Sequence, residues 1–107
     1  MIELKQNADE FYDSAEDNCK KKRWNVAVSD YFKALATYCD YVLYQQIKRI
    51  PKNHTDRFEL LKVQFPKQYQ ILHGLFELYR KSYNLRLTEK DAKKVKEATD
   101  EIRAKAT

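Results

Sequence analysis

The chain has 107 residues, of which 43% are hydrophobic and 35% are charged, and its formal net charge is +5. This composition excludes a disordered chain and a membrane-embedded one, and the length fits a single domain over residues 1–107. Because the chain holds one Gly and two Pro, it lacks the turn residues that an all-β fold needs, and we predict an all-α protein. The positive charge is a modest indication of anionic partners.

The N-terminal residues Met1, Ile2 and Glu3 lack the basic and apolar regions of a signal peptide. No apolar run approaches the roughly 18 residues of a membrane-spanning helix. We therefore expect a cytoplasmic protein that does not interact with membranes.

In chain order, the first helix is expected from Ile2 to about Lys21. Its apolar face is formed by Leu4, Ala8, Phe11, Ala15 and Cys19. The basic run 20–23 closes the helix and complements the negative end of its dipole. A phosphate-binding patch is the alternative interpretation of this run.

The longest predicted helix runs from Asn25 to Ile50, about 25 residues, with Asn25 as its N-cap and Pro51 as its terminator. Its apolar residues are Ala27, Val28, Tyr31, Phe32, Leu35, Tyr38, Cys39, Val42, Leu43, Ile47 and Ile50. A face this wide needs other helices around most of its circumference. Tyr41 and Tyr44 fall beside this face and are candidates for a dimer surface.

The two cysteines, Cys19 and Cys39, lie in consecutive antiparallel helices. At helical rise they are about 20 Å apart, too far for a disulfide. Neither has a second Cys or His at metal-ligand spacing, so no metal site or cofactor is predicted.

A short helix is expected next, capped by Asn53 or Thr55 and broken by Pro66. The helix that follows starts near Lys67. Its buried stripe is predicted to contain Tyr69, Leu72, Leu75, Phe76, Tyr79 and Tyr83. Thr88 and Asp91 form a capping box at the start of the last helix, which has a narrow apolar stripe of small residues. We expect that helix to end near Ala104 and to pack peripherally.

Short connections favour antiparallel neighbours, so we predict an up-and-down bundle of four to five helices. In such a bundle, residues about 25 positions apart converge on one end. The predicted cluster at this pole contains His54, Arg57, Arg80, Tyr83 and Asn84, and we take these as candidate ligand-binding residues. The alternatives are that His54 hydrogen-bonds within its loop, and that Arg80 forms an ion pair with Asp56 or Glu59.

Four segments resemble motifs of the HEPN (higher eukaryotes and prokaryotes nucleotide-binding) domains. The segment Ala27–Ala34 resembles their A-x-x-x-Y-[YF]-x-A core, and Pro51–His54 resembles P-x-x-H. Leu78–Tyr83 is similar to a compressed L-Y-x-x-R-x-x-x-Y segment, and Thr88–Ala92 is similar to the start of the last helix. The resemblance extends from Phe11 onward and depends on the order and spacing of these segments.

The resemblance implies a helical bundle that is often a homodimer and is paired with a small nucleotidyltransferase in toxin–antitoxin-like modules. Many HEPN domains are metal-independent ribonucleases with an R-x(4 to 6)-H signature. Arg80 stands at the position of the Arg, but the following residues 81–87 contain no His. This departure favours a binding module over an enzyme.

Three functions therefore stay open. The first is a non-catalytic HEPN-like module that dimerises, pairs with a nucleotidyltransferase, or binds a nucleotide or RNA at the pole of His54 and Arg80. The second is a divergent ribonuclease, in which His54 transfers the proton and Arg80 or Arg57 holds the phosphate. The third is a generic helical adaptor.

Overall fold

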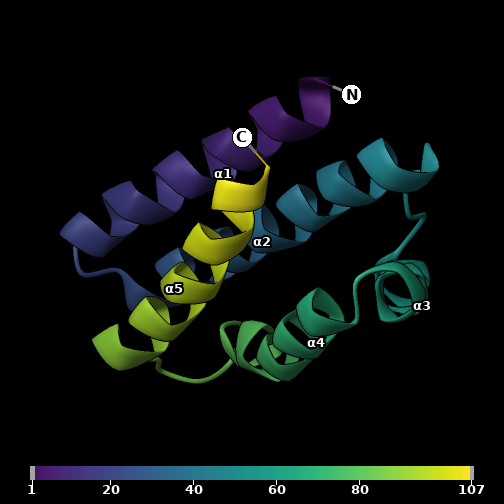
Figure 1. Ribbon diagram of the computed structural model, residues 1–107. Helices are drawn as coiled ribbons and strands as arrows, with labels where there is room; N and C mark the ends of the chain where they lie inside the picture. The colour runs from purple at the N-terminus through teal and green to yellow at the C-terminus, as the bar shows by residue number, and fades with distance from the viewer. Residues whose placement is uncertain (1, 107) are drawn as a thin grey trace.

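The computed structural model describes residues 2–106, which fold into five helices (Figure 1). The helices are α1 (Ile2–Lys20), α2 (Trp24–Ile47), α3 (His54–Gln64), α4 (Pro66–Lys81) and α5 (Glu89–Lys105). The described part of the chain contains no strand. These elements confirm the predicted all-α bundle.

Helix α2 is the centre of the structure, because each of the other four helices packs against it. Figure 1 shows α1 running beside α2, α5 crossing over it and α4 below it, while α3 is seen nearly end-on. The residues of α2 that are buried by these neighbours are Ala27, Val28, Tyr31, Phe32, Ala34, Leu35, Ala36, Tyr38, Cys39, Asp40 and Leu43. All but Asp40 belong to the hydrophobic core.

The connection between α1 and α2 is a tight turn with a left-handed residue. Lys22 has φ 58°, and the N–H groups of Lys22 and Arg23 donate to the carbonyls of Cys19 (3.0 Å) and Asn18 (2.9 Å). This is the Schellman pattern that ends many helices, in which Gly is the preferred left-handed residue. The turn brings α2 back antiparallel to α1, as the hairpin prediction required.

The prediction that Asn25 caps α2 is wrong. Arg23 occupies the cap position and makes no side-chain cap hydrogen bond. The amide nitrogen of Asn25 instead donates to the carbonyls of Ser82 (2.9 Å) and Leu85 (2.5 Å), and its amide oxygen accepts from the N–H of Leu87 (2.9 Å). Asn25 therefore fixes the α4–α5 connection against the start of α2.

The predicted end of the long helix at Ile50 is also wrong, because α2 ends at Ile47. Lys48 adopts φ 57° and donates its N–H to the carbonyl of Tyr44 (2.8 Å), which closes the helix with a left-handed residue. The residue before Pro51 is in any case disfavoured in helical conformation, so the helix has to stop before Ile50.

Asn53 is the cap of α3, since its side chain accepts a hydrogen bond from the N–H of Asp56 (2.9 Å). Pro66 takes the first turn of α4, where its missing N–H costs nothing. Tyr83 was predicted in the buried stripe of α4, but it is 72% exposed. Because α4 ends at Lys81, Tyr83 lies beyond the helix, and its exposed ring packs edge-on against that of Tyr79.

Helix α5 begins with the predicted capping box, in which Thr88 accepts from the N–H of Asp91 and Asp91 accepts from the N–H of Thr88. The expectation that α5 packs peripherally is wrong, because it packs directly on α2. Its buried residues include Ala92, Val95 and Thr99. The Thr99 hydroxyl donates to the carbonyl of Val95 (2.7 Å) and lies 3.1 Å from the carbonyl of Tyr31 on α2.

Candidate ligand pocket at His54 and Arg57

The candidate site lies where α2, α3 and α4 meet. The Asn53 cap begins α3 at His54, so that His54 and Arg57 are three residues apart and share one face of the helix. This face turns toward Asp40 on α2 and the rings of Phe76 and Tyr79 on α4.

The side chains of Arg57 and Asp40 form a buried ion pair. Nε and Nη2 of Arg57 donate to the two carboxylate oxygens of Asp40 at 2.7 and 2.8 Å. This two-point geometry is the strongest that Arg forms with a carboxylate. Burial raises the pKa of the Asp40 carboxyl, and the Arg57 guanidinium opposes that shift. The pair fixes the Arg57 side chain in one orientation.

The remaining Nη1 group of Arg57 donates to Nδ1 of His54 at 2.9 Å. A guanidinium has no acceptor, so Nδ1 must provide the lone pair, and neutral His54 carries its proton on Nε2. Burial lowers the pKa of His54, and the positive charge of Arg57 lowers it further. His54 is therefore held neutral in a single tautomer at neutral pH.

An open cavity of about 160 Å³ borders these groups. Its lining residues are Phe11, Phe32, Lys33, Ala36, Thr37, His54, Arg57 and Tyr79. The rings of Phe32 and Tyr79 stack with their centroids 4.5 Å apart, and no acidic residue is among the lining residues. Phe32 is buried, so the aromatic surface at the cavity is the partly exposed ring of Tyr79. Lys33 gives the cavity a positive charge, and Arg57, whose charge is balanced by Asp40, adds N–H donors.

The predicted site residues are brought together in part. His54 and Arg57 share the cavity, and Tyr83 is connected to it because its hydroxyl lies 2.9 Å from that of Tyr79. Arg80 instead pairs with Glu77 on its own helix (3.4 Å), and both side chains are largely exposed. The N–H of Asn84 donates to the carbonyl of Lys81 in the turn after α4. Neither Arg80 nor Asn84 lines the cavity.

Neither alternative interpretation of these residues holds. His54 does not hydrogen-bond within its loop, because its ring nitrogen pairs with Arg57 on the first turn of α3. The ion pair of Arg80 with Asp56 or Glu59 is wrong, because Arg80 pairs with Glu77. Asp56 pairs with Arg49 instead (3.1 Å) and accepts from the N–H of Lys52.

Sequence reasoning missed Asp40 and Lys33, and it assigned Phe32 and Tyr79 to the core alone. A signal for Asp40 was available: it lies four residues after Ala36 and three before Leu43, both on the buried face. A charge on such a face needs a partner, and this indicates a buried ion pair.

Three further observations concern metal ligands, membrane spans and cysteines. Among residues 2–106, no three His, Cys, Asp or Glu side chains gather where they could hold a metal ion. No helix in the same range has the length and apolarity to cross a membrane. Cys19 and Cys39 are free thiols.

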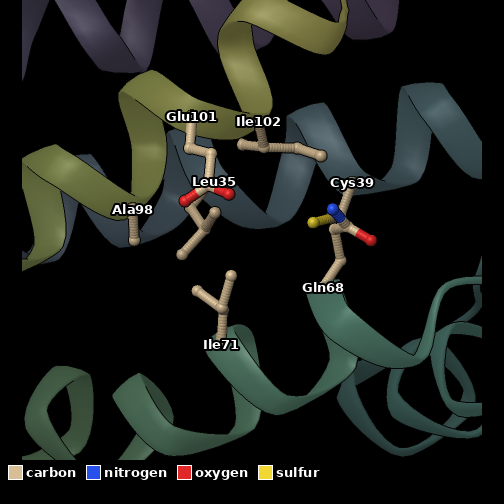
Figure 2. A pocket seen from close by; sticks show the side chains of 7 residues that line it. All are labelled: Leu35, Cys39, Gln68, Ile71, Ala98, Glu101 and Ile102. Atoms are coloured by element: carbon tan, nitrogen blue, oxygen red, sulfur yellow. The ribbon is translucent and has the colours of Figure 1, made fainter.

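A second cavity lies inside the core, between α2, α4 and α5. Figure 2 shows the side chains that face it: Leu35, Cys39, Gln68, Ile71, Ala98, Glu101 and Ile102. Its volume of about 10 Å³ leaves room for at most one water molecule. The cavity is a packing gap and offers no ligand site.

The chain was compared with protein-family models, with curated proteins and with solved structures. None of the three comparisons found a match. The likeness to HEPN domains therefore depends on the four sequence segments alone.

Proposed function

We propose that the protein is a non-catalytic, HEPN-like helical module that binds a nucleotide or a short RNA in the cavity beside His54. The observation that carries this proposal is the pairing of the Lys33 charge and the remaining Arg57 donors with the partly exposed ring of Tyr79. Cations hold phosphate and aromatic rings hold bases, and nucleotide ligands present both groups together.

The hydrogen-bond donors of the site that have no protein partner also support an anionic ligand. Three of the five N–H groups of Arg57 are engaged by Asp40 and His54, which leaves two for a ligand oxygen. The ammonium group of Lys33 lies on the same cavity, and Nε2–H of His54 is a further donor. Several donors and no lining carboxylate suit an anionic ligand.

The hydrogen bond between Arg57 and His54 argues against the ribonuclease alternative. A general base must offer a free lone pair to the 2′-hydroxyl proton. In His54 the Nδ1 lone pair accepts from Arg57, so the proton occupies Nε2. As held, His54 offers a hydrogen-bond donor at Nε2 but no free lone pair for a proton.

The partner proteins are proposed from the resemblance. We place a homodimer contact at Tyr41 and Tyr44 of α2, both of which are half-buried in the single chain. Light scattering of the purified protein tests the dimer, and a Tyr41→Glu, Tyr44→Glu double variant is expected to be monomeric. A nucleotidyltransferase encoded next to this reading frame would support the paired module.

Calorimetric titration with AMP and with a short single-stranded RNA tests the binding proposal. Lys33→Ala is expected to weaken binding about tenfold, which corresponds to about 1.4 kcal/mol. The matched control Lys90→Ala removes an exposed cation from the start of α5 and should leave the affinity unchanged. Absence of binding by the wild-type protein would contradict the proposal.

An RNA cleavage assay separates the module from the ribonuclease. We expect no cleavage by the wild-type protein in the presence of a chelator. Cleavage by the wild-type protein that is lost in His54→Ala would contradict the binding-module proposal and support the ribonuclease.

A further inference from the structure

The structure divides the basic run 20–23 into two halves. Lys20 lies in the last turn of α1, and Lys21 forms an ion pair with Asp17 one turn earlier (2.9 Å). These two residues complement the end of the helix, as the dipole interpretation of the run requires. Lys22 and Arg23 follow the helix, and neither forms an ion pair with any residue in 2–106.

The α4–α5 connection brings a third cation, Arg86, to the same place. The side-chain amide of Asn25 makes three hydrogen bonds to the backbone of this connection and fixes it against the start of α2. The α1–α2 turn, which is closed by the left-handed Lys22, lies at the same end of the molecule (Figure 1). Two connections that are far apart in sequence therefore hold these cations in a fixed arrangement.

An open cavity of about 200 Å³, which we call the Arg86 cavity, lies between the two connections. Its lining residues are Lys22, Arg23, Trp24, Asn25, Val26 and Arg86. The three cations are exposed, and none of the described residues that line the cavity is acidic. Like charges that lie close together repel, so this arrangement favours the binding of an anion.

The carboxylate that Arg23 does influence belongs to Asp17. The pKa of Asp17 is lowered by its hydrogen bond from Lys21 and, more weakly, by the charges of Lys20 and Arg23. Asp17 has Lys21 as its ion-pair partner and does not line the Arg86 cavity. It therefore leaves the charge of the cavity largely uncompensated.

The Arg86 cavity and the His54 cavity lie along the same face of α2. Val26 lines the first and Lys33 lines the second. The two residues are seven positions apart, which is about 10 Å along one face of a helix. Asp30 lies between them, and its carboxylate accepts a hydrogen bond from Ser14 on α1 (2.7 Å). An extended anionic chain can therefore contact both cavities at once.

We propose that the Arg86 cavity binds a backbone phosphate of the same single-stranded RNA whose nucleotide occupies the His54 cavity. This assignment rests on the proposed function, since it extends the binding of RNA from one cavity to two. Arginine suits a phosphate ligand, because its guanidinium group donates two parallel hydrogen bonds to phosphate oxygens. AMP has no second phosphate along a chain, so its binding should involve the His54 cavity alone.

Calorimetric titrations with hexauridylate and with AMP test the assignment. Arg86→Ala should weaken the binding of hexauridylate about fivefold at low salt and leave the affinity for AMP unchanged. Lys105→Ala is the matched control, since it removes an exposed cation from the opposite end of α5. The control should change neither affinity.

The salt dependence of binding gives a second readout. For single strands, log K falls with log[salt] by about 0.7 for each phosphate that the protein neutralises. Arg86→Ala should therefore make the slope for hexauridylate shallower by about 0.7, and Lys105→Ala should leave it unchanged. A variant that had merely lost its fold would lose AMP binding as well.

The outcomes separate this site from the proposed function. Hexauridylate binding that Lys33→Ala weakens and Arg86→Ala does not would overturn the Arg86 cavity alone. Binding that Arg86→Ala weakens and Lys33→Ala does not would support the Arg86 cavity and contradict the His54 cavity. No binding of hexauridylate by the wild-type protein would overturn both. Equally tight binding of hexaglutamate would show a general preference for anionic chains and overturn the assignment to RNA.

Discussion

Arg57 forms a bidentate ion pair with Asp40, in which Nε and Nη2 each donate to one carboxylate oxygen at 2.7 and 2.8 Å. Asp40 is 5% exposed, so water cannot solvate the charge that remains when its partner is removed. The ion pair connects α3 to the central helix. The Nη1 group of Arg57 also donates to Nδ1 of His54, which fixes the tautomer of that ring.

The first prediction concerns this ion pair. Arg57→Ala or Asp40→Ala should each lower the free energy of unfolding by about 3–5 kcal/mol, because each leaves one buried charge without its partner. The double variant should lose less than the sum of the two single variants. Urea unfolding followed by circular dichroism measures all three, and additive losses would contradict a coupled pair.

The second prediction concerns pH. The folded state lowers the pKa of His54 from its ordinary value of 6.5, so the unfolded chain binds more protons near that pH. The stability contribution is present above pH 6.5 and is lost as the pH falls from there through the lower pKa of the folded state. Unfolding measured at pH 7.5 and 5.5 should show this loss.

His54→Gln is the comparison for the pH effect, since its side-chain oxygen can still accept from Arg57 but does not titrate. The variant should be less sensitive to pH between 7.5 and 5.5 than the wild-type protein. An unchanged pH dependence would mean that other groups cause it.

The third prediction concerns the left-handed residue Lys22. Lys22→Gly should raise the free energy of unfolding by about 0.5–1 kcal/mol, because Gly adopts φ 58° without the Cβ penalty. Lys20→Gly, two residues earlier and still helical, should lower it by up to about 1 kcal/mol. Thermal unfolding of both variants should therefore give shifts of opposite sign.

The fourth prediction concerns Asn25. Asn25→Ala removes three hydrogen bonds to the α4–α5 connection and should cost about 1–3 kcal/mol. Asn84→Ala changes an exposed side chain in that same connection and should stay within about 0.5 kcal/mol of the wild type. Similar losses in both variants would show that Asn25 has no special role.

The fifth prediction compares two buried tyrosines. Tyr31→Phe should leave stability unchanged or raise it by up to about 1 kcal/mol, because the lost hydroxyl has no nitrogen or oxygen partner and only the weak Cys19 thiol beside it. Tyr38→Phe should lower it by about 0.5–1.5 kcal/mol, because its hydroxyl bonds with Asp9 and Arg103. Chemical unfolding distinguishes the two, and equal losses would contradict the structure at Tyr31.

The helices could be predicted because their signals are local. Apolar spacing alone indicates α1, α2 and α4, and the Thr88–Asp91 capping box marks the start of α5 within a few residues. The ends were harder. Pro51 disfavours a helical Ile50, but Lys22 and Lys48 both take left-handed conformations that sequence rules assign to Gly or Asn. The end of α2 at Ile47 could therefore not be predicted from residue types.

The candidate site was predicted only in part, because tertiary contacts decide the rest. His54 and Arg57 were found because one helix turn holds both. Asp40 lies 17 residues from Arg57, and nothing local connects the two. Arg80 and Tyr79 are adjacent in sequence but face different ways on α4, and the arrangement of the helices, rather than residue type, puts Tyr79 in the cavity.

Helix α3 buries few side chains, and this affects its local stability. Leu61 is the one residue of this helix that is buried, whereas α2 buries residues along most of its length. Backbone amides of α3 should therefore exchange with deuterium in partial openings that leave those of α2 protected. A ligand that contacts both Lys33 and Arg57 would connect α3 to α2. Ligand binding should therefore slow deuterium exchange of the α3 amides.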